Sequence, residues 1–502
     1  MEVICLLLAA AESVDDRIGC AFNATAWVVV TFRSLRKPGK PSVSPRRIDG
    51  VSSAPGQCNL TNTEFWIVAA ISEQALPTST DVVIIGGGIV GTAAAYFLAK
   101  QGVRVVLCEK GDIAGEQSSR NWGFVRQQGR DPAELPMVME SLRIWRRISD
   151  EIGEDVGFRQ GGLLYVSDQP EHVARYESWV EIARQHQLDT RMLSGSELKA
   201  RLPGTTGRWM AAMHTPSDGQ AEPSKAAPAI ARAAAAAGAT ILTRCAVRGV
   251  ETAGGRISHV VTERGSIATP AAVCAAGAWS SLFAANVGIA LPQLKIRGSV
   301  FRTTPGPEIA DGGIWTPQVA IRRRLDGGYS IAHGGASAHD LVPDTFRYFK
   351  EFKPAYETER HRLQLRIGRR FVDELLTPRR WSAHGVSPFE KTRVLDPAPV
   401  NGVLEEAFAH LRRLFPAFEN VTVIERWAGL IDVTPDALPV ISEVDALPGF
   451  YFATGFSGHG FGIGPGAGKV IAEMVSGVPA TIDRTPFAYD RFRQGVQIAG
   501  DL

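Results

Sequence analysis

Apolar runs broken by glycine turns set the pattern of the chain from residue 80 onwards. A strand buried on both faces is predicted for DVVIIG (81–86), a helix of small residues for IVGTAAAYFLAKQG (89–102), and a second buried strand for VRVVLCEK (103–110). Gly102 stands where it can end the helix. The order strand, turn, helix, strand is typical of the first unit of a doubly wound α/β domain.

The later part of the chain alternates between helical and strand periods. A helix is predicted over about 132–151, because Leu135, Val138, Leu142, Trp145 and Ile148 recur on one of its faces. The other expected elements are a strand at 161–167, a helix at 222–239, a hairpin and strand at 255–280, and a helical stretch at about 354–376. We see no internal repeat, and the mixture indicates an α/β protein.

Length and composition are those of a globular protein with two or three domains. The chain has 502 residues, of which 45% are hydrophobic and 21% charged. With 54 basic and 52 acidic residues, the net charge of +2 favours no nucleic-acid partner. No apolar run is long enough to cross a membrane. The six cysteines form no CxxC pair or zinc-like pattern, so we expect buried free thiols, no metal and a cytoplasmic location.

The first 79 residues differ from the rest of the chain. A disordered linker is predicted for 34–57, which is rich in proline, serine and basic residues. The apolar start, MEVICLLLAAAES, lacks the basic residues of a secretory signal. Residues 1–79 are therefore treated as an atypical or disordered extension, which could be a tail, a targeting segment or an over-extended reading frame.

The glycines of the first turn predict a dinucleotide site. Gly86 allows the tight turn, Gly88 lets the backbone approach a pyrophosphate, and Gly91 lets the helix pack closely on the strand. The free N–H groups of the helix N-terminus would face the phosphates. Glu109 ends the second strand and is placed to accept hydrogen bonds from a ribose diol.

Three further segments extend this picture: GEQSSRNWGFVR (115–126), VCAAGAWS (273–280), and WAGLIDVTPDALPVIS (427–442) followed by ATGFSGHGFGIGPGAGKVIAEMVSG (453–477). Together with the glycine motif they resemble the D-amino-acid oxidase/dehydrogenase superfamily of FAD enzymes, which includes glycine oxidase and sarcosine-type oxidases. The resemblance implies a Rossmann-type, glutathione-reductase-like FAD-binding domain with an inserted antiparallel-sheet substrate domain.

The domain boundaries follow from placing these segments. The FAD-binding domain is expected to comprise 80–156, 216–292 and 427–485, the substrate domain 157–215 and 293–426, and a C-terminal tail 486–502.

The resemblance also implies which residues hold the cofactor. They are Gly86, Gly88, Ile89, Val90, Gly91, Glu109, Lys110, Ser118, Ser119, Arg120, Asn121, Trp122, Val247, Ala276, Gly277, Trp279, Gly458, Gly460, Phe461 and Gly462. Val247 is placed against the adenine, and the helix after the last glycine loop is expected to point at the flavin. Members of the family that bind FAD covalently use a later cysteine. No cysteine follows Cys274, so we expect non-covalent FAD.

The substrate side departs from the family pattern. Ile431 and Asp432 stand after WAGL, where close relatives have a carboxylate-binding arginine, and the final loop reads Ser457, Gly458, His459, Gly460. One interpretation moves the anchor to the hairpin predicted at 319–335.

In that hairpin, alternation places Arg322 and Arg324 on one face and Arg323 on the other. Arg126 and Arg297 are further candidates for the anchor. The other interpretation is a substrate with a different polar layout, whose cationic amine Asp432 would attract.

The candidate catalytic residues are therefore His459, Arg322 and Asp432. His333 and His384 are weaker candidates, Trp122 and Trp427 are assigned mainly to packing, and the basic run at 360–371 is assigned to a solvated helix face.

The leading functional hypothesis is an FAD-dependent oxidoreductase. It would oxidise the C–N bond of an amino acid, imino acid or secondary amine by hydride transfer to the flavin. Oxygen or a quinone/flavoprotein chain would accept the electrons, and a homo-oligomer is compatible with the chain. The alternatives are an N-demethylating oxidase of sarcosine-like substrates and an FAD-binding subunit that needs a partner for turnover.

Overall fold

A six-stranded sheet carries the glycine motif. Its strands are β1 (Val82–Ile85), β2 (Val105–Cys108), β9 (Thr240–Leu242), β13 (Ala272–Cys274), β21 (Val440–Glu443) and β22 (Phe450–Thr454). The order is β21-β22-β13-β1-β2-β9, with β21 antiparallel to β22 and the other pairs parallel. The computed structural model describes residues 74–360 and 363–493; the predicted linker and nearly all of the 1–79 extension lie outside this range.

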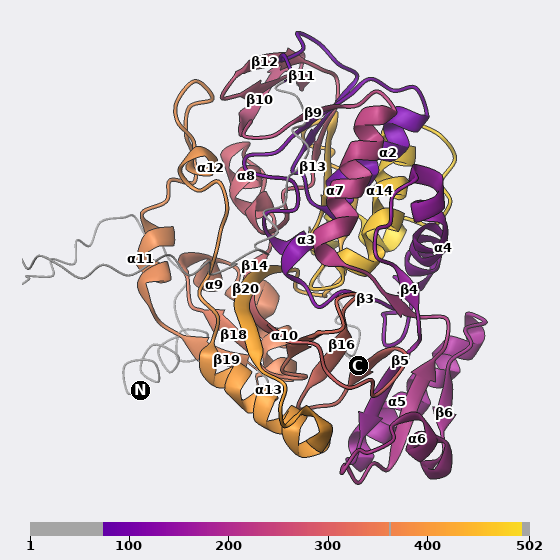
Figure 1. Ribbon diagram of the computed structural model, residues 1–502. Helices are drawn as coiled ribbons and strands as arrows, with labels where there is room; N and C mark the ends of the chain where they lie inside the picture. Colours follow the sequence, from indigo (N-terminus) through magenta and orange to yellow (C-terminus); the bar gives the residue numbers. More distant parts are fainter. Residues whose placement is uncertain (1–73, 361–362, 494–502) are drawn as a thin grey trace, which may run out of the picture. The chain divides into compact units, whose positions relative to one another are not determined.

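Helices cover one face of this sheet and a small sheet covers the other. The helices are α2 (Ile89–Lys100), α4 (Leu135–Ile152), α7 (Pro223–Ala236) and α14 (Gly460–Ser476), which lie together in Figure 1. The small antiparallel sheet consists of β10 (Val247–Ala253), β11 (Arg256–Thr262) and β12 (Gly265–Ala268). Because both faces are covered, β1 and β2 are buried at every position, as their apolar sequences predict.

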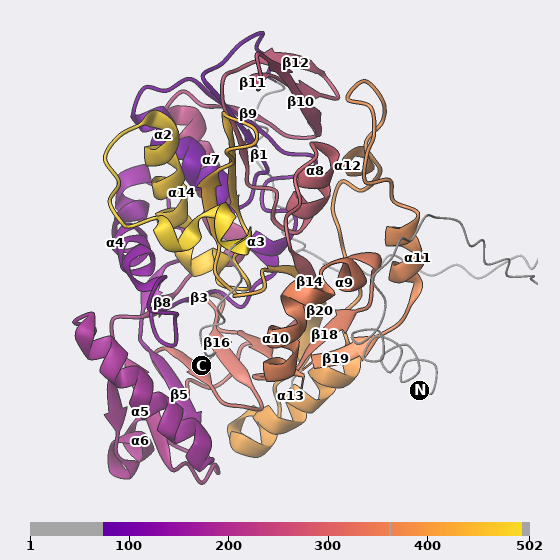
Figure 2. The same cartoon turned by 180° about the vertical axis from the view of Figure 1, so that it is seen from behind.

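A larger, mostly antiparallel sheet lies on the other side of the molecule (Figure 2). Its strands are β5 (Leu163–Ser167), β6 (Arg191–Leu193), β7 (Ala211–Thr215), β14 (Leu294–Thr303), β15 (Gly313–Trp315), β16 (Ala320–Arg323), β17 (Tyr329–Ala332), β18 (Ser337–Asp340), β19 (Leu363–Arg366) and β20 (Val423–Val433). Helix α13 (Asn401–Leu414) packs its apolar face against β14 and β17. Helix α5 (Pro170–Gln185) packs against β5, β6 and β7. The α/β class with an inserted, mostly antiparallel sheet is confirmed.

Strands β14 and β20 link the two parts of the fold. They pair antiparallel from Leu294 and Val433 at one end to Thr303 and Val423 at the other. β20 is continuous across residues 426 and 427, between which the sequence analysis divides two domains. The domain boundaries stay predictions.

The helix predicted at about 354–376 is wrong. The structure has helix α10 (Phe349–Glu359), strand β19 and helix α11 (Arg369–Leu375) there. β19 pairs in parallel with β18, so a free sheet edge supplies backbone hydrogen bonds that a helix would otherwise make internally. The described residues of the basic run at 360–371 are therefore divided between β19 and the start of α11 and do not form one helix face. Leu365 and Ile367 in it are 42% and 66% exposed.

Within the described ranges, no helix is long and apolar enough to cross a bilayer.

Candidate functional site

A cavity of about 400 Å³ lies where the carboxyl ends of the parallel strands face the larger sheet. Residues at the ends of β1, β2, β13 and β22 line one side of it, and Tyr165, Val300 and Trp315 of the larger sheet line the other. Ligand sites of open α/β sheets lie at this edge. A volume of this size suits a small molecule or part of a cofactor.

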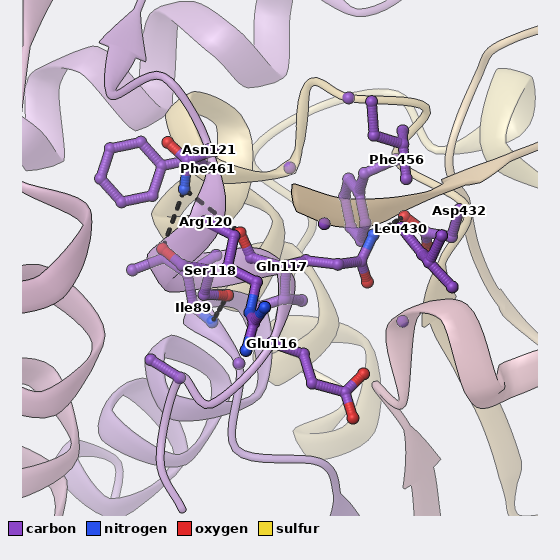
Figure 3. Close-up of a pocket in the computed structure, with 18 of the residues that line it drawn as sticks. Ile89, Glu116, Gln117, Ser118, Arg120, Asn121, Leu430, Asp432, Phe456 and Phe461 are labelled. Atoms are coloured by element: carbon purple, nitrogen blue, oxygen red, sulfur yellow. Dashed lines mark hydrogen bonds between the residues drawn. The ribbon is translucent and has the colours of Figure 1, made fainter. Parts of the chain in front are cut away.

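The glycine turn after β1 is built for close backbone approach. Gly86 has a φ of +112°, and a Cβ there would lie 2.5 Å from the carbonyl oxygen of Ala275. A Cβ on Gly91 would collide with the carbonyl oxygen of Gly86, so helix α2 can sit closely on the strand only with glycine there. Gly88 precedes α2 without a side-chain cap, and the Ile89 N–H donates to Ser118 Oγ at 2.9 Å (Figure 3).

Glu109 holds the turn next to this glycine loop. Its two carboxylate oxygens accept the N–H groups of Gly87 and Gly111, each at 2.7 Å. Burial raises the pKa of Glu109, and these two hydrogen bonds oppose that rise. Each carboxylate oxygen keeps a further lone pair. A ribose diol at this place is thus compatible with the carboxylate, and its contact with Glu109 stays a prediction.

The segment around α3 (Gln117–Arg120) ties the cavity wall together, as Figure 3 shows. Glu116 accepts hydrogen bonds from Lys110 Nζ at 2.5 Å, and from Trp279 Nε1 and the Leu395 N–H at 3.0 Å. Lys110, which was expected at the cofactor, therefore forms an ion pair with Glu116. Asn121 Nδ2 donates to the carbonyl oxygen of Ser118 at 2.8 Å.

The cavity brings together most of the residues predicted at the cofactor. Of the predicted set, Gly91 and Ser119 lie outside the lining and the others are part of it. Two helix N-termini reach the cavity, that of α2 through Ile89 and that of α14 through Gly460, Phe461 and Gly462. Two helix N-termini, a glycine cradle and the Glu109 carboxylate together fit a dinucleotide with a pyrophosphate. Those residues would hold FAD, which supplies the hydride acceptor of the reaction.

Asp432 lines the cavity but serves mainly as an internal acceptor. It is 4% exposed and accepts hydrogen bonds from Gln117 Nε2 at 2.7 Å and from the Gly455 N–H at 2.8 Å. Thr454 Oγ1 lies 3.3 Å from the same carboxylate. Burial raises the pKa of Asp432, and these donors oppose the rise. Because both oxygens are engaged, the geometry does not favour Asp432 as counter-ion of a substrate amine.

Arg322 is not brought to the cavity. The predicted hairpin is present as β16 and β17, but the guanidinium is 1% exposed and pairs with Glu222 at 3.0 and 3.3 Å. It lies behind Gly123, where a Cβ would approach its Nε to 2.7 Å. An arginine neutralised in this way is a poor carboxylate anchor.

The other arginine candidates of that group are also paired. Arg323 pairs with Glu308, Arg324 with Asp326, and Arg297 with Asp340. Neither they nor His333 and His384 are among the residues that line the cavity.

A cationic corner of the cavity was largely missed from the sequence. Arg126 and Arg130 both line it, next to Tyr165, whose ring lies 5.5 Å below the Arg126 guanidinium. Arg130 is 4% exposed, and its Nε and Nη1 have no hydrogen-bond partner among the described residues. Burial, reinforced by Arg126, lowers the pKa of Arg130 to about 9. Arg130 follows a turn, where no periodicity marks the direction of a side chain.

His459 stands beside this corner, as expected for a residue of the last glycine loop. It precedes α14, and its Nδ1 lies 2.9 Å from Glu134 Oε2. Glu134 is fully buried at the start of α4. Sequence reasoning missed Glu134, because a carboxylate before a helix is normally read as a cap. No cluster of three or more metal-ligating side chains occurs in the described part of the chain.

Comparison with known proteins agrees with this geometry. Residues 81–474 match the DAO family, described as FAD dependent oxidoreductase. An L-amino acid deaminase from Proteus myxofaciens, solved with anthranilate, superposes with a TM-score of 0.81 and 36% identity, covering 84% of this chain and 95% of that one. For L-proline dehydrogenase from P. horikoshii the TM-score is 0.69 and the identity 26%, over 84% and 99% of the two chains.

A curated relative is similar to this chain over nearly the same length. Sarcosine oxidase subunit beta from Arthrobacter sp is 27% identical over 430 residues, covering 83% of this chain and 92% of that protein. The match to the family extends from the first buried strand to the last helix of the FAD-binding motifs. The chain therefore belongs to the DAO family of FAD-dependent oxidoreductases, and FAD is its cofactor.

Proposed function

We propose that this enzyme oxidises the C–N bond of an α-amino acid, whose carboxylate binds at Arg130 with the help of Arg126. The observation that carries the proposal is the buried Arg130 guanidinium on the cavity wall, whose Nε and Nη1 have no hydrogen-bond partner among the described residues. Glu134 and Asp218 act on this cation through space, but no described carboxylate forms a direct ion pair with it. Burial of a cation without such a pair is costly, so a partner with negative charge is expected at that point. A carboxylate fits the guanidinium fork with two hydrogen bonds.

The surroundings of this corner suit an apolar substrate body. Trp122, Phe124, Tyr165 and Trp315 line the cavity, and the rings of Tyr165 and Trp315 lie edge to face at 4.2 Å. Such a wall excludes water from the reacting carbon and strengthens the electrostatic contact at Arg130. The arginines orient the substrate through its carboxylate, and the aromatic wall holds its side chain.

Similarity supports the L configuration within this proposal. The solved relative with 36% identity is an L-amino acid deaminase, and a second one is an L-proline dehydrogenase. We therefore favour an L-α-amino acid over a D-amino acid. An amino acid whose nitrogen is a secondary amine is the second candidate substrate, because a curated relative is a sarcosine oxidase subunit.

The proposal has four further parts. FAD is bound without a covalent bond, electrons pass to oxygen or to a quinone or flavoprotein, the enzyme works in the cytoplasm, and it forms a homo-oligomer. Buried free thiols at Cys108, Cys245 and Cys274 support a reducing compartment. Precipitation with acid tests the first part: the yellow colour should stay in the supernatant, and a yellow pellet would show a covalent bond.

An anaerobic visible spectrum tests the function itself. The purified holoenzyme is titrated with L- and D-forms of alanine, leucine, phenylalanine and proline, then with sarcosine and with amines that lack a carboxylate. Bleaching of the flavin bands by L-amino acids, but not by the matched amines, is the expected result. Bleaching by the carboxylate-free amines would overturn the anchor at Arg130. A flavoprotein that none of these compounds reduces would overturn the proposal as a whole.

A further inference from the structure

His459 is held in one orientation at the edge of the cavity. Its side chain is 22% exposed, and Nδ1 lies 2.9 Å from the carboxylate of Glu134, which has no exposed surface. The residue lines the cavity at the start of α14, next to the glycines expected at the flavin. A histidine fixed on one nitrogen presents the other nitrogen in a defined direction.

The partner decides which nitrogen carries the proton. An ionised carboxylate can only accept hydrogen bonds, so Nδ1 must be the protonated nitrogen of a neutral His459. Nε2 then keeps its lone pair, and within the described part of the chain the hydrogen bond of the His459 ring is the one at Nδ1. This is the arrangement of a general base whose ring is oriented by a buried carboxylate.

Charges around the pair favour this state at neutral pH. Burial lowers the pKa of His459, and the Arg130 cation adds to the effect, while Glu134 opposes it. Burial alone would raise the pKa of Glu134, but His459, Arg130 and Arg126 outweigh it and hold that pKa below its usual value. Asp432, across the 455–458 turn, already accepts a hydrogen bond from the Gly455 N–H.

The reaction needs a base because hydride can leave the α-carbon only when the nitrogen has a free lone pair. An α-amino acid carries an ammonium group at neutral pH, and its lone pair is then tied up in an N–H bond. The Arg126 and Arg130 cations disfavour a nearby ammonium, so they assist the loss of its proton to a neutral acceptor.

We propose that Nε2 of His459 takes the proton from the substrate ammonium and that Glu134 is the positioning residue for this base. The inference rests on the proposed function. One N–H bond of the ammonium breaks, an N–H bond to Nε2 forms, and the electron pair stays on the substrate nitrogen. That pair becomes the C=N bond when the α-hydrogen leaves as hydride to FAD, and the imidazolium is balanced by the Glu134 carboxylate.

The test compares the rate of flavin reduction over pH in four holoenzymes: wild type, His459→Gln, Glu134→Gln and the control His384→Gln. The side chain of His384 is 78% exposed, and His384 is not among the residues that line the cavity. Anaerobic stopped-flow follows bleaching from about pH 6 to about pH 10, the range in which a general base and an amine change charge. Flavin content of each variant is measured first.

His459→Gln should reduce the rate about 10²-fold at neutral pH, as general-base catalysis typically contributes, and approach wild type at high pH where the free amine is already present. Glu134→Gln keeps an acceptor for Nδ1 but removes the negative charge, so the acid limb of the profile should move to lower pH. His384→Gln should match wild type throughout.

Several results would overturn the role. A constant ratio between wild type and His459→Gln at every pH would mean that His459 is structural only. A wild-type rate without an acid limb would mean the same. Failure of every α-amino acid to reduce wild type would instead overturn the proposed function, and this role with it.

Nitrogen-15 NMR of the histidine rings gives a readout that is independent of turnover. In wild type at neutral pH, the His459 signal, assigned by its loss in His459→Gln, should show a protonated Nδ1 and an unprotonated Nε2. A proton on Nε2 alone would contradict the proposed base.

Discussion

The side-chain amide of Gln117 donates to Asp432 at 2.7 Å (Figure 3), and its oxygen accepts the N–H of Ala278 at 3.1 Å. Asp432 in turn accepts the N–H of Gly455 at 2.8 Å. Ala278, Asp432 and Gly455 belong to segments that are far apart in the sequence. Each of these segments borders the cavity. The Gln117–Asp432 pair therefore holds the wall of the cofactor site in place. This structural role replaces the substrate contact expected for Asp432.

Asp432→Asn should destabilise the protein and weaken FAD binding. The new amide group would face N–H donors, leaving buried groups without acceptors at about 1–3 kcal/mol. Urea unfolding and the dissociation constant of FAD measure the effect. Asp168→Asn, at an exposed position, should change neither. A changed KM with unchanged stability and FAD affinity would show that Asp432 binds substrate after all.

Gly86→Ala should abolish FAD binding, whereas Gly102→Ala should not. Both glycines have positive φ, but a Cβ at Gly86 would lie 2.5 Å from the Ala275 carbonyl oxygen, and one at Gly102 meets nothing within 4 Å. Gly102→Ala therefore costs only backbone strain, of order 1–3 kcal/mol in unfolding. Flavin absorbance of the purified variants decides. Equal flavin content in both would show that the turn tolerates a side chain.

Arg130→Met should raise the KM for α-amino acids about 10²-fold or more, because removal of one partner from a buried charge pair costs 2–5 kcal/mol. The effect should vanish for the matched amine without a carboxylate, should that amine react at all. Arg143→Met, on the exposed side of α4, is the control. Steady-state kinetics and an unreactive carboxylate inhibitor provide the measurements. An unchanged inhibitor affinity would place the anchor elsewhere.

Arg322→Met should lower stability without a selective effect on substrate binding. The substitution removes the buried partner of Glu222 at 3.0 Å and leaves Arg324 at 4.0 Å. Breaking a buried ion pair typically costs about 3–5 kcal/mol. The double variant Arg322→Met with Glu222→Gln should recover much of that loss, because no buried charge remains unpaired. Chemical unfolding of the two variants compares the costs. A larger defect in KM than in stability would return Arg322 to the list of substrate anchors.

Stability should fall on acidification, and His214 should contribute. Burial lowers the pKa of His214 from 6.5 to about 4 in the fold. The unfolded chain then binds the proton first, so this part of the stability is present above about pH 6.5 and is lost as pH falls toward 4. Between about pH 7 and about pH 5 the loss is about 2 kcal/mol.

His214→Gln removes this titration, and the difference between its unfolding free energies at the two pH values should be smaller than in wild type. Other groups titrate equally in both proteins. The same pH dependence in wild type and variant would mean that His214 keeps its ordinary pKa in the fold.

The part of the molecule that the sequence determines is the part with local constraints. Gly86, Gly88 and Gly91 recur at the spacing that a tight turn and a close helix require, and the apolar runs at 81–86 and 103–110 allow only buried strands. At 354–376 the local sequence pattern predicts a helix, but part of this segment forms β19, which pairs with the free edge of β18.

Only the tertiary structure decides which charged side chains form ion pairs. Arg322 and Arg130 look alike in the sequence. Arg322 pairs with Glu222, whereas Arg130 reaches the cavity with Nε and Nη1 unpaired among the described residues. Glu134 and His459 are 325 positions apart and come together only because α4 packs beside α14. An ion pair depends on where two distant backbones bring their side chains, and that distance is set by the packing of whole elements, which no local pattern encodes.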